Sequence, residues 1–178
     1  MSMLANFCLM ARYNHWMNTK LYDAAATLTP AQLQQPRGAF FGSIIATCNH
    51  LLVADILWLQ RFAKHYGNGK LTAVAALTTP TQLEQILYPE LPALKSQRQW
   101  LDQQLCDWVT TLAPQQLGTV LVYHNSKGVP HRKPFSAVLL HFFNHQTHHR
   151  GQLTTLLFQA GIDVGVTDLL ALIEDTDA

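Results

Sequence analysis

The chain has few charged residues, and neither sign is in excess. Lysine and arginine number 12 and aspartate and glutamate number 11 among 178 residues, so the formal net charge is +1. The basic residues are scattered along the sequence, whereas a nucleic-acid-binding protein normally gathers them on one face. We therefore expect no nucleic-acid partner.

Cysteine is also scarce. The three cysteines, Cys8, Cys48 and Cys106, are far apart, and no C-x-x-C pair is present. An odd, scattered set excludes a disulfide framework and a cysteine metal clip. We interpret these residues as small buried thiols, in keeping with a reducing compartment.

Long apolar runs are missing as well. No uninterrupted stretch approaches the roughly 20 residues that span a bilayer, so we expect no membrane partner. The first 13 residues include Asn6 and Arg12 and lack a cleavage-site pattern, which argues against a signal peptide. We expect a cytoplasmic protein.

What the chain does contain is a large apolar fraction, 48% of its residues, arranged at helical spacing. The length suits a single domain over residues 1–178. Apolar residues at steps of three and four predict four long helices, at about 3–28, 43–66, 91–111 and 134–160. Four such helices with connectors predict an all-α fold, a four-helix bundle.

Local signals mark the ends of these helices and the segments between them. Ser43 is placed to cap the second helix, and glycines at 67, 69 and 161 are typical stop signals. The turn sequence Asn125-Ser126-Lys127-Gly128, between 120–123 and 129–132, predicts a hairpin before the last helix. We also expect a short helical piece beginning at Thr79-Pro80 and another near 169–174.

Histidine is abundant, and its distribution points to a site. Of nine histidines, four lie in the last predicted helix. His145 and His149 are four residues apart and share one helix face, where two imidazoles can hold one divalent metal ion. His141 and His145 form an equally good pair by spacing. His148 lies about 100° around the helix from His149 and cannot point the same way, so one of these two must face elsewhere.

His50 is the natural third ligand. It lies in a helix that is apolar almost all round, which indicates a central position. Taken alone it would be read as a core histidine bonded to a carbonyl, but beside an inward imidazole pair a metal ligand is favoured. Three neutral imidazoles with one open position are typical of a reactive metal rather than a structural one. The residue types do not select the metal, since imidazole suits zinc, nickel, copper and iron.

Several motifs in the same order resemble a known family. The chain resembles the DinB/YfiT-like superfamily of suspected metalloenzymes. The resemblance rests on Tyr13-Asn14-His15-Trp16, on Phe40-Phe41-Gly42-Ser43-Ile44, on Asn49-His50-Leu51-Leu52-Val53-Ala54-Asp55 with Trp58 and Arg61, and on the run from His141 to Gln152.

The resemblance implies more than the spacing does. It implies a left-handed four-helix bundle with up-down-down-up connectivity, and a metal triad of His50, His145 and His149. It further implies a divalent ion, zinc or nickel, and a homodimer. Related bundles include transferases and an isomerase that use low-molecular-weight thiols. One departure is His15, where we expect a basic residue such as arginine; His15 is thus a minor further candidate for the site.

These inferences lead to three hypotheses. The first is a metal-dependent enzyme of the thiol-transferase or hydrolase type, whose open site takes water or the thiolate of a small-molecule substrate; no separate general base is evident. The second is a non-enzymatic, dimeric bundle with a stress-related binding role, in which the metal only stabilises the fold. The third is a bundle without metal.

Other polar residues receive supporting roles. We expect Tyr13 or Asn14 to line the site or to orient a ligand's second nitrogen, with a purely structural role for Asn14 equally favoured. We expect Asp55 to pair with Arg61 or Arg150.

Overall fold

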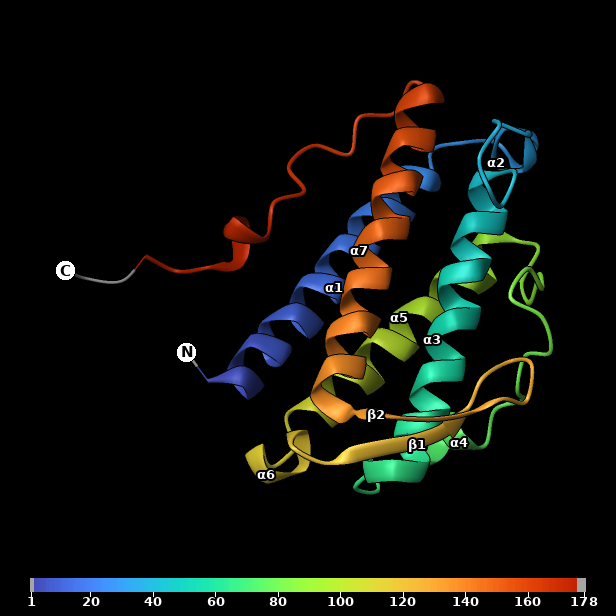
Figure 1. Ribbon diagram of the computed structural model, residues 1–178. Coiled ribbons are helices and arrows are strands. Elements are labelled where there is room, and N and C mark those ends of the chain that lie inside the picture. Colours follow the sequence, from blue (N-terminus) through green and yellow to red (C-terminus); the bar gives the residue numbers. More distant parts are fainter. Residues whose placement is uncertain (1, 176–178) are drawn as a thin grey trace.

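Four long helices form the body of the molecule. The computed structural model describes residues 2–175. The long helices are α1 (Met3–Ala25), α3 (Ile44–Tyr66), α5 (Leu91–Val109) and α7 (Phe135–Gln159). In Figure 1 α1 and α7 run upward while α3 and α5 run downward. The all-α bundle is confirmed, with the up-down-down-up order that the resemblance implied.

The helix ends follow the signals in the sequence. The Ser43 side chain accepts a hydrogen bond from the Ala46 amide and caps α3, which ends at Gly67. The C-terminal stop of α7 is Gly161, whose φ of +84° lies in the left-handed region that favours glycine. These residues set both ends of α3 and the C-terminal end of α7.

The long helices pack around an aromatic and aliphatic core. Helix α1 packs on α5 and α7, and α3 packs on α7 and α5. The Phe62 and Trp108 rings stack with centroids 5.3 Å apart, and the Trp108 indole N–H donates to the Tyr66 carbonyl at 2.7 Å. Phe135 and Phe142 complete the cluster edge-on to Phe62. The predicted helix faces are thus buried as the 3.6-residue period requires.

A polar network is buried between all four long helices. Arg98 on α5 lies 2.7 Å from a carboxylate oxygen of Asp55 on α3 and 2.7 Å from one of Asp102. Asn14 on α1 donates to Asp102 at 2.9 Å and accepts from Arg150 on α7. Because buried charges are costly unless paired, this network has to form together with the apolar core.

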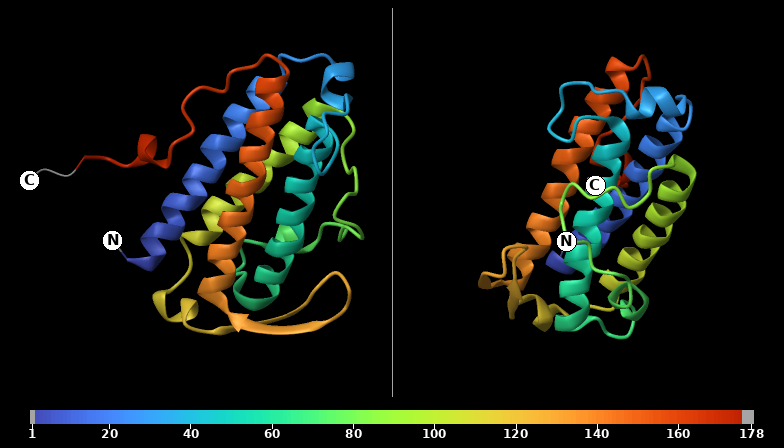
Figure 2. Two further views of the ribbon diagram at one scale, coloured as in Figure 1. Left: turned by 45° about the horizontal axis from the view of Figure 1, so that its top comes forward. Right: turned by 90° about the vertical axis from the view of Figure 1, so that its right-hand side faces the viewer.

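A two-stranded hairpin crosses one end of the bundle. Strands β1 (Val120–His124) and β2 (Pro130–Pro134) pair antiparallel with Val122 opposite Arg132. The hairpin lies beside the C-terminal part of α3 and the start of α7 (Figures 1 and 2). The predicted hairpin and its turn are confirmed.

The shorter elements agree less well with expectation. They are α2 (Pro30–Gln34), α4 (Thr72–Ala75), α6 (Pro114–Leu117) and the 3-10 helix η1 (Leu169–Leu172). The short C-terminal helix is confirmed as η1. The helical piece expected from Thr79-Pro80 is wrong: that stretch is irregular, and the helical turn precedes it at α4. A four-residue turn is too short to give a periodic signal.

The three cysteines are unpaired in the structure. Cys48 is buried, and burial raises the pKa of its thiol to about 12, while Cys8 and Cys106 are half-buried; all three are free thiols. Among residues 2–175, none of the helices has the length and apolar content that crossing a bilayer requires.

Candidate metal centre

The structure brings His50, His145 and His149 together. His50 comes from α3 and the other two from one face of α7, which packs antiparallel to α3. The Nε2 atom of His149 lies 3.3 Å from Nε2 of His50 and 3.1 Å from Nε2 of His145. One potential ligand atom from each ring lies within 4.8 Å of the other two. The four-residue spacing on α7 and the neighbouring position of α3 produce this cluster.

Oxygen acceptors fix the tautomers of two of the rings. Nδ1 of His50 lies 3.0 Å from the Leu83 carbonyl oxygen, and Nδ1 of His149 lies 2.8 Å from Oε1 of Gln152. A carbonyl oxygen can only accept, so in each ring Nδ1 carries the proton and Nε2 keeps its lone pair. Such partners are typical of metal-ligating histidines, because they orient the ring and raise its basicity.

This arrangement fits a divalent cation. With the tautomers set in this way, Nε2 of His50 and Nε2 of His149 are two acceptors facing each other at 3.3 Å with no proton between them. Facing lone pairs repel unless a cation lies near both. Tetrahedral zinc with Zn–N bonds of about 2.0–2.1 Å would separate two ligand nitrogens by roughly 3.3 Å. The donor set therefore matches a metal that prefers imidazole nitrogen.

The electrostatic setting keeps the rings neutral. Burial, together with the neighbouring rings of His149 and His50, lowers the pKa of His145 to about 3. Burial also lowers the pKa of His50 and of His149, partly offset by their hydrogen bonds to Leu83 and Gln152. Neutral imidazole is the form that binds a metal, so protons do not compete at neutral pH.

Phe41 covers one side of the cluster. Its ring stacks on His50 with centroids 3.8 Å apart and an interplanar angle of 18°, and meets His149 edge-on at 5.6 Å. Phe41 comes from the turn before α3, where Gly42 has a φ of +80°. Sequence reasoning noted this motif without assigning it a role at the site. The aromatic pair before the Ser43 cap was the available signal, because a residue there lies close to the first turns of α3.

The other candidate histidines lie outside the cluster. His141 is exposed, with its ring centroid 6.0 Å from that of His145. His148 is exposed, as the helical geometry requires, and its Nε2 lies 3.3 Å from Nε2 of Gln152. His15 on α1 is half-buried and is not one of the three grouped residues.

Tyr13 does not have the role expected for it, and of the two roles expected for Asn14 the structural one is found. Tyr13 donates to the Thr167 carbonyl at 2.7 Å, and Asn14 belongs to the buried polar network, so neither orients a ligand. The orienting groups are the Leu83 carbonyl and Gln152.

Asp55 also has a different partner from the one expected. It pairs with Arg98 of α5, and it accepts a hydrogen bond from Gln146. The sequence pattern does not indicate which residue of α5 lies opposite Asp55 of α3.

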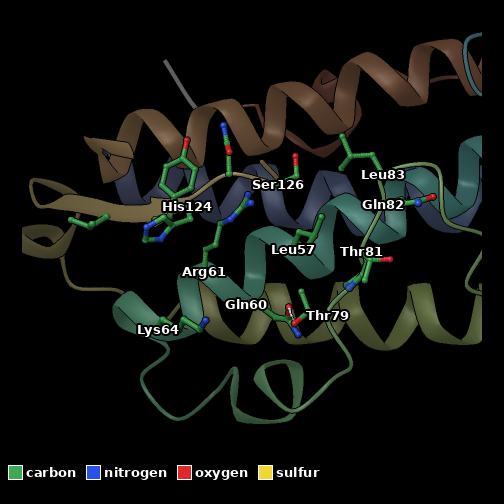
Figure 3. Close-up of a pocket in the computed structure, with 14 residues that line it drawn as sticks. Leu57, Gln60, Arg61, Lys64, Thr79, Thr81, Gln82, Leu83, His124 and Ser126 are labelled. Atoms are coloured by element: carbon green, nitrogen blue, oxygen red, sulfur yellow. Dashed lines mark hydrogen bonds between the residues drawn. The ribbon is translucent and has the colours of Figure 1, made fainter. Parts of the chain in front are cut away.

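A cleft leads away from the imidazoles beneath the hairpin. A cavity of about 230 Å³ is lined by His50 and His145 at one end and by Arg61 and Tyr123 at the other. A second cavity of about 490 Å³ continues from it and shares Arg61, Leu83 and Ser126 as lining residues. Figure 3 shows the outer cavity between α3, the segment carrying Thr79 to Leu83, and the hairpin. A small molecule can therefore approach the imidazoles from this side.

The fold and the site together define a class: a helical bundle that gathers three imidazoles able to hold a metal ion beside an open cleft. Within that class the chain belongs to the DinB family, whose family-wide sequence pattern matches residues 1–177. It is similar to a protein named Protein DinB from Bacillus subtilis (strain 168), with 25% identity over 156 residues that cover 88% of this chain and 87% of that protein. No solved structure gives a significant match.

Proposed function

We propose that this protein is a metal-dependent enzyme of the thiol-transferase or hydrolase type. In this proposal His50, His145 and His149 hold a divalent ion, zinc or nickel, and a small molecule enters through the cleft beneath the hairpin. The supporting observation is that three imidazoles converge, and that two of them, His50 and His145, line a cavity that another molecule can enter. A purely structural metal site would be closed by a fourth protein ligand.

The chain's own residues supply binding and orientation. When bound, a divalent ion with an open position supplies Lewis acidity to a substrate atom. The Leu83 carbonyl and Gln152 hold the rings of His50 and His149 in place, and Phe41 covers one face of His50. Among the described residues that line the two cavities there is no aspartate or glutamate. The proposal therefore assigns no carboxylate general base.

The proposal is tested by elemental analysis of untagged protein. We expect about one equivalent of divalent metal in the wild type and its loss in the His50→Ala variant, because two imidazoles on one helix bind far more weakly than three. The His65→Ala variant is the matched control, since His65 lies on the same helix as His50 but outside the cluster and outside both cavities. Equal metal content in the wild type and His50→Ala would show that the triad assignment is wrong.

A second readout separates an enzyme from a metal-stabilised binding module. Cobalt-substituted protein is titrated with a low-molecular-weight thiol, and its visible spectrum is followed. A thiolate-to-metal charge-transfer band, lost on His50→Ala substitution, supports an open site that takes the substrate thiol. An unchanged spectrum with a strong loss of thermal stability on chelation supports the structural role instead.

A further inference from the structure

The cleft contains an arginine that has no carboxylate partner. Among residues 2–175, the ion pairs closer than 4.0 Å involve Lys95 and Arg98, and none involves Arg61. Arg61 is nevertheless half-buried, and burial lowers the pKa of its guanidinium. A guanidinium has five N–H donors and a full charge, and none of these donors in Arg61 has a protein acceptor among the described residues, so they are open to water or to a ligand. Arg61 therefore has donor capacity that the described chain does not use.

Two aromatic rings hold the guanidinium in position. It lies 4.6 Å from the centroid of the Trp58 ring and 5.0 Å from that of Tyr123. Contacts with two rings limit the orientations of a guanidinium and leave its N–H edge free for a planar partner. Figure 3 shows Arg61 extending from α3 toward the segment that carries His124 and Ser126, into the cavity. The side chain is thus preorganised for a ligand, which lowers the entropic cost of binding.

Arg61 and His50 lie on the same face of α3. Eleven residues are almost exactly three helical turns, or about 16 Å along the axis. The residues of α3 that line the inner cavity follow this face: His50, Ala54, Leu57, Trp58 and Arg61. Side chains lean toward the N-terminus of their helix, so Arg61 leans toward His50. One elongated molecule can therefore contact both ends of the cavity, with its two contact points on the order of 10 Å apart.

The charge of the cleft has one sign. Lys64, one turn beyond Arg61, lines the outer cavity, and no acidic residue is among the lining residues of either cavity within the described chain. Glu84 lies close enough to His50 to raise its pKa slightly, but it is not a lining residue. An anionic group would therefore meet attraction at the Arg61 and Lys64 end of the cleft.

We propose that Arg61 is a substrate-binding residue that recognises an oxyanion, a carboxylate or a phosphate, at the end of the cleft away from the imidazoles. This deepens the proposed function and rests on it: the substrate carries its reactive group at the metal end and its anionic group at Arg61. Substrate selection then depends on the distance between these two groups.

The test compares ligands that differ only in the charged group. Octanoate, octyl phosphate and the neutral octanamide are titrated into the protein by calorimetry, both metal-free and cobalt-loaded. We expect at least one of the two anions to bind about tenfold or more tightly than the amide, as a charge-assisted pair at a fixed arginine allows. The ratio between octanoate and octyl phosphate identifies which oxyanion the subsite prefers.

Variants show whether Arg61 is responsible. The preference for the anion should disappear in Arg61→Met, which keeps the apolar contact with Trp58, and should fall but remain in Arg61→Lys. It should persist in Arg132→Met, the matched control, because Arg132 is exposed on β2 and lines neither cavity. Equal binding of anion and amide by the wild type, or an undiminished preference in Arg61→Met, would overturn the proposal.

A final comparison keeps this outcome distinct from that of the proposed function. Cobalt-loaded protein is titrated with ω-mercaptooctanoate and with the corresponding mercapto-alcohol, and the charge-transfer band is followed. A band of equal strength and equal affinity for both thiols shows an open metal site without an oxyanion subsite. An Arg61-dependent preference for octanoate in calorimetry without any band shows the subsite without thiol binding at the metal.

Discussion

In two of the three imidazoles, an oxygen acceptor at Nδ1 leaves the Nε2 lone pair free to bind a metal. Nδ1 of His149 donates to Gln152 and Nδ1 of His50 donates to the Leu83 carbonyl, so both Nε2 lone pairs point into the cluster. Gln152 follows His149 by three residues, so the sequence itself contained this signal. The Leu83 partner is a backbone carbonyl, which any residue type supplies, and its position depends on how a 24-residue connection between α3 and α5 folds. It could not be predicted from residue types.

Replacing the Gln152 acceptor should weaken metal binding without removing a ligand. We expect the Gln152→Ala variant to bind zinc about 10- to 100-fold more weakly, because the His149 ring loses the partner that fixes its tautomer and orientation. Competition with a chromophoric chelator measures the affinity. Gln152→Glu, which keeps an acceptor at this position, should retain tight binding. Gln159→Ala, at an exposed site on the same helix, should have no effect, and an equal loss in both alanine variants would contradict this role.

At the scale of elements, the long helices and the hairpin could be predicted, but the segment from 67 to 90 could not. Periodicity identifies a helix only when several turns are present, and this segment contains the four residues of α4 and irregular backbone. It is held in place by side chains of α3 instead. The Gln60 amide donates to the Leu77 carbonyl at 2.8 Å, and Asn49 binds the Leu87–Tyr88 backbone. One wall of the cleft therefore depends on two amide side chains.

Asn49 should affect both the stability of the segment from 67 to 90 and metal binding by the histidine cluster. Its side chain accepts from the Leu87 and Tyr88 amides at 2.9 Å each and donates to the Tyr88 carbonyl at 2.9 Å, while the residue itself is fully buried. We expect Asn49→Ala to lower the free energy of unfolding by about 1–3 kcal/mol, because buried backbone groups lose their partners. It should also weaken metal binding, since the Leu83 carbonyl lies in the same segment.

Urea denaturation and metal competition measure the two effects. Gln103→Ala is a suitable control, since Gln103 is an exposed amide on α5 and exposed substitutions usually stay within about 0.5 kcal/mol. If Asn49→Ala matched this control in stability, Asn49 would not be holding the wall.

At the scale of the whole molecule, one charged network joins every long helix. Arg98 on α5 contacts Asp55 on α3 and Asp102 on its own helix. Asn14 on α1 connects Asp102 to Arg150 on α7. Gln146, also on α7, donates to Asp55 and closes the network. The sequence predicted an arginine partner for Asp55 but named Arg61 or Arg150 instead of Arg98, because pairing across helices depends on their rotation and height. The network borders the imidazole face of α7, since Gln146 follows His145 in the helix.

Removing the central cation should be far more costly than removing a surface one. We expect Arg98→Met to lower the free energy of unfolding by about 3–5 kcal/mol, because two buried carboxylates lose their counterion. Lys95→Met is the matched control on the same helix. Lys95 pairs with Asp23 at 2.5 Å, but both side chains are partly exposed, so its loss should cost at most about 1 kcal/mol. Similar denaturation midpoints for the two variants would show that the network is not a stability determinant.

The hairpin turn can change in sequence and length without disturbing the helices that carry the histidine cluster. Asn125 and Ser126 face the cavity from a turn that closes on itself, because the Asn125 side chain accepts from the amides of Lys127 and Val129. Such turns tolerate insertion and exchange, whereas the two helices that carry the imidazoles do not. Under the proposed function, this turn can change over evolutionary time to suit different substrates while the histidine cluster stays constant, so homologues with identical histidines need not share a reaction.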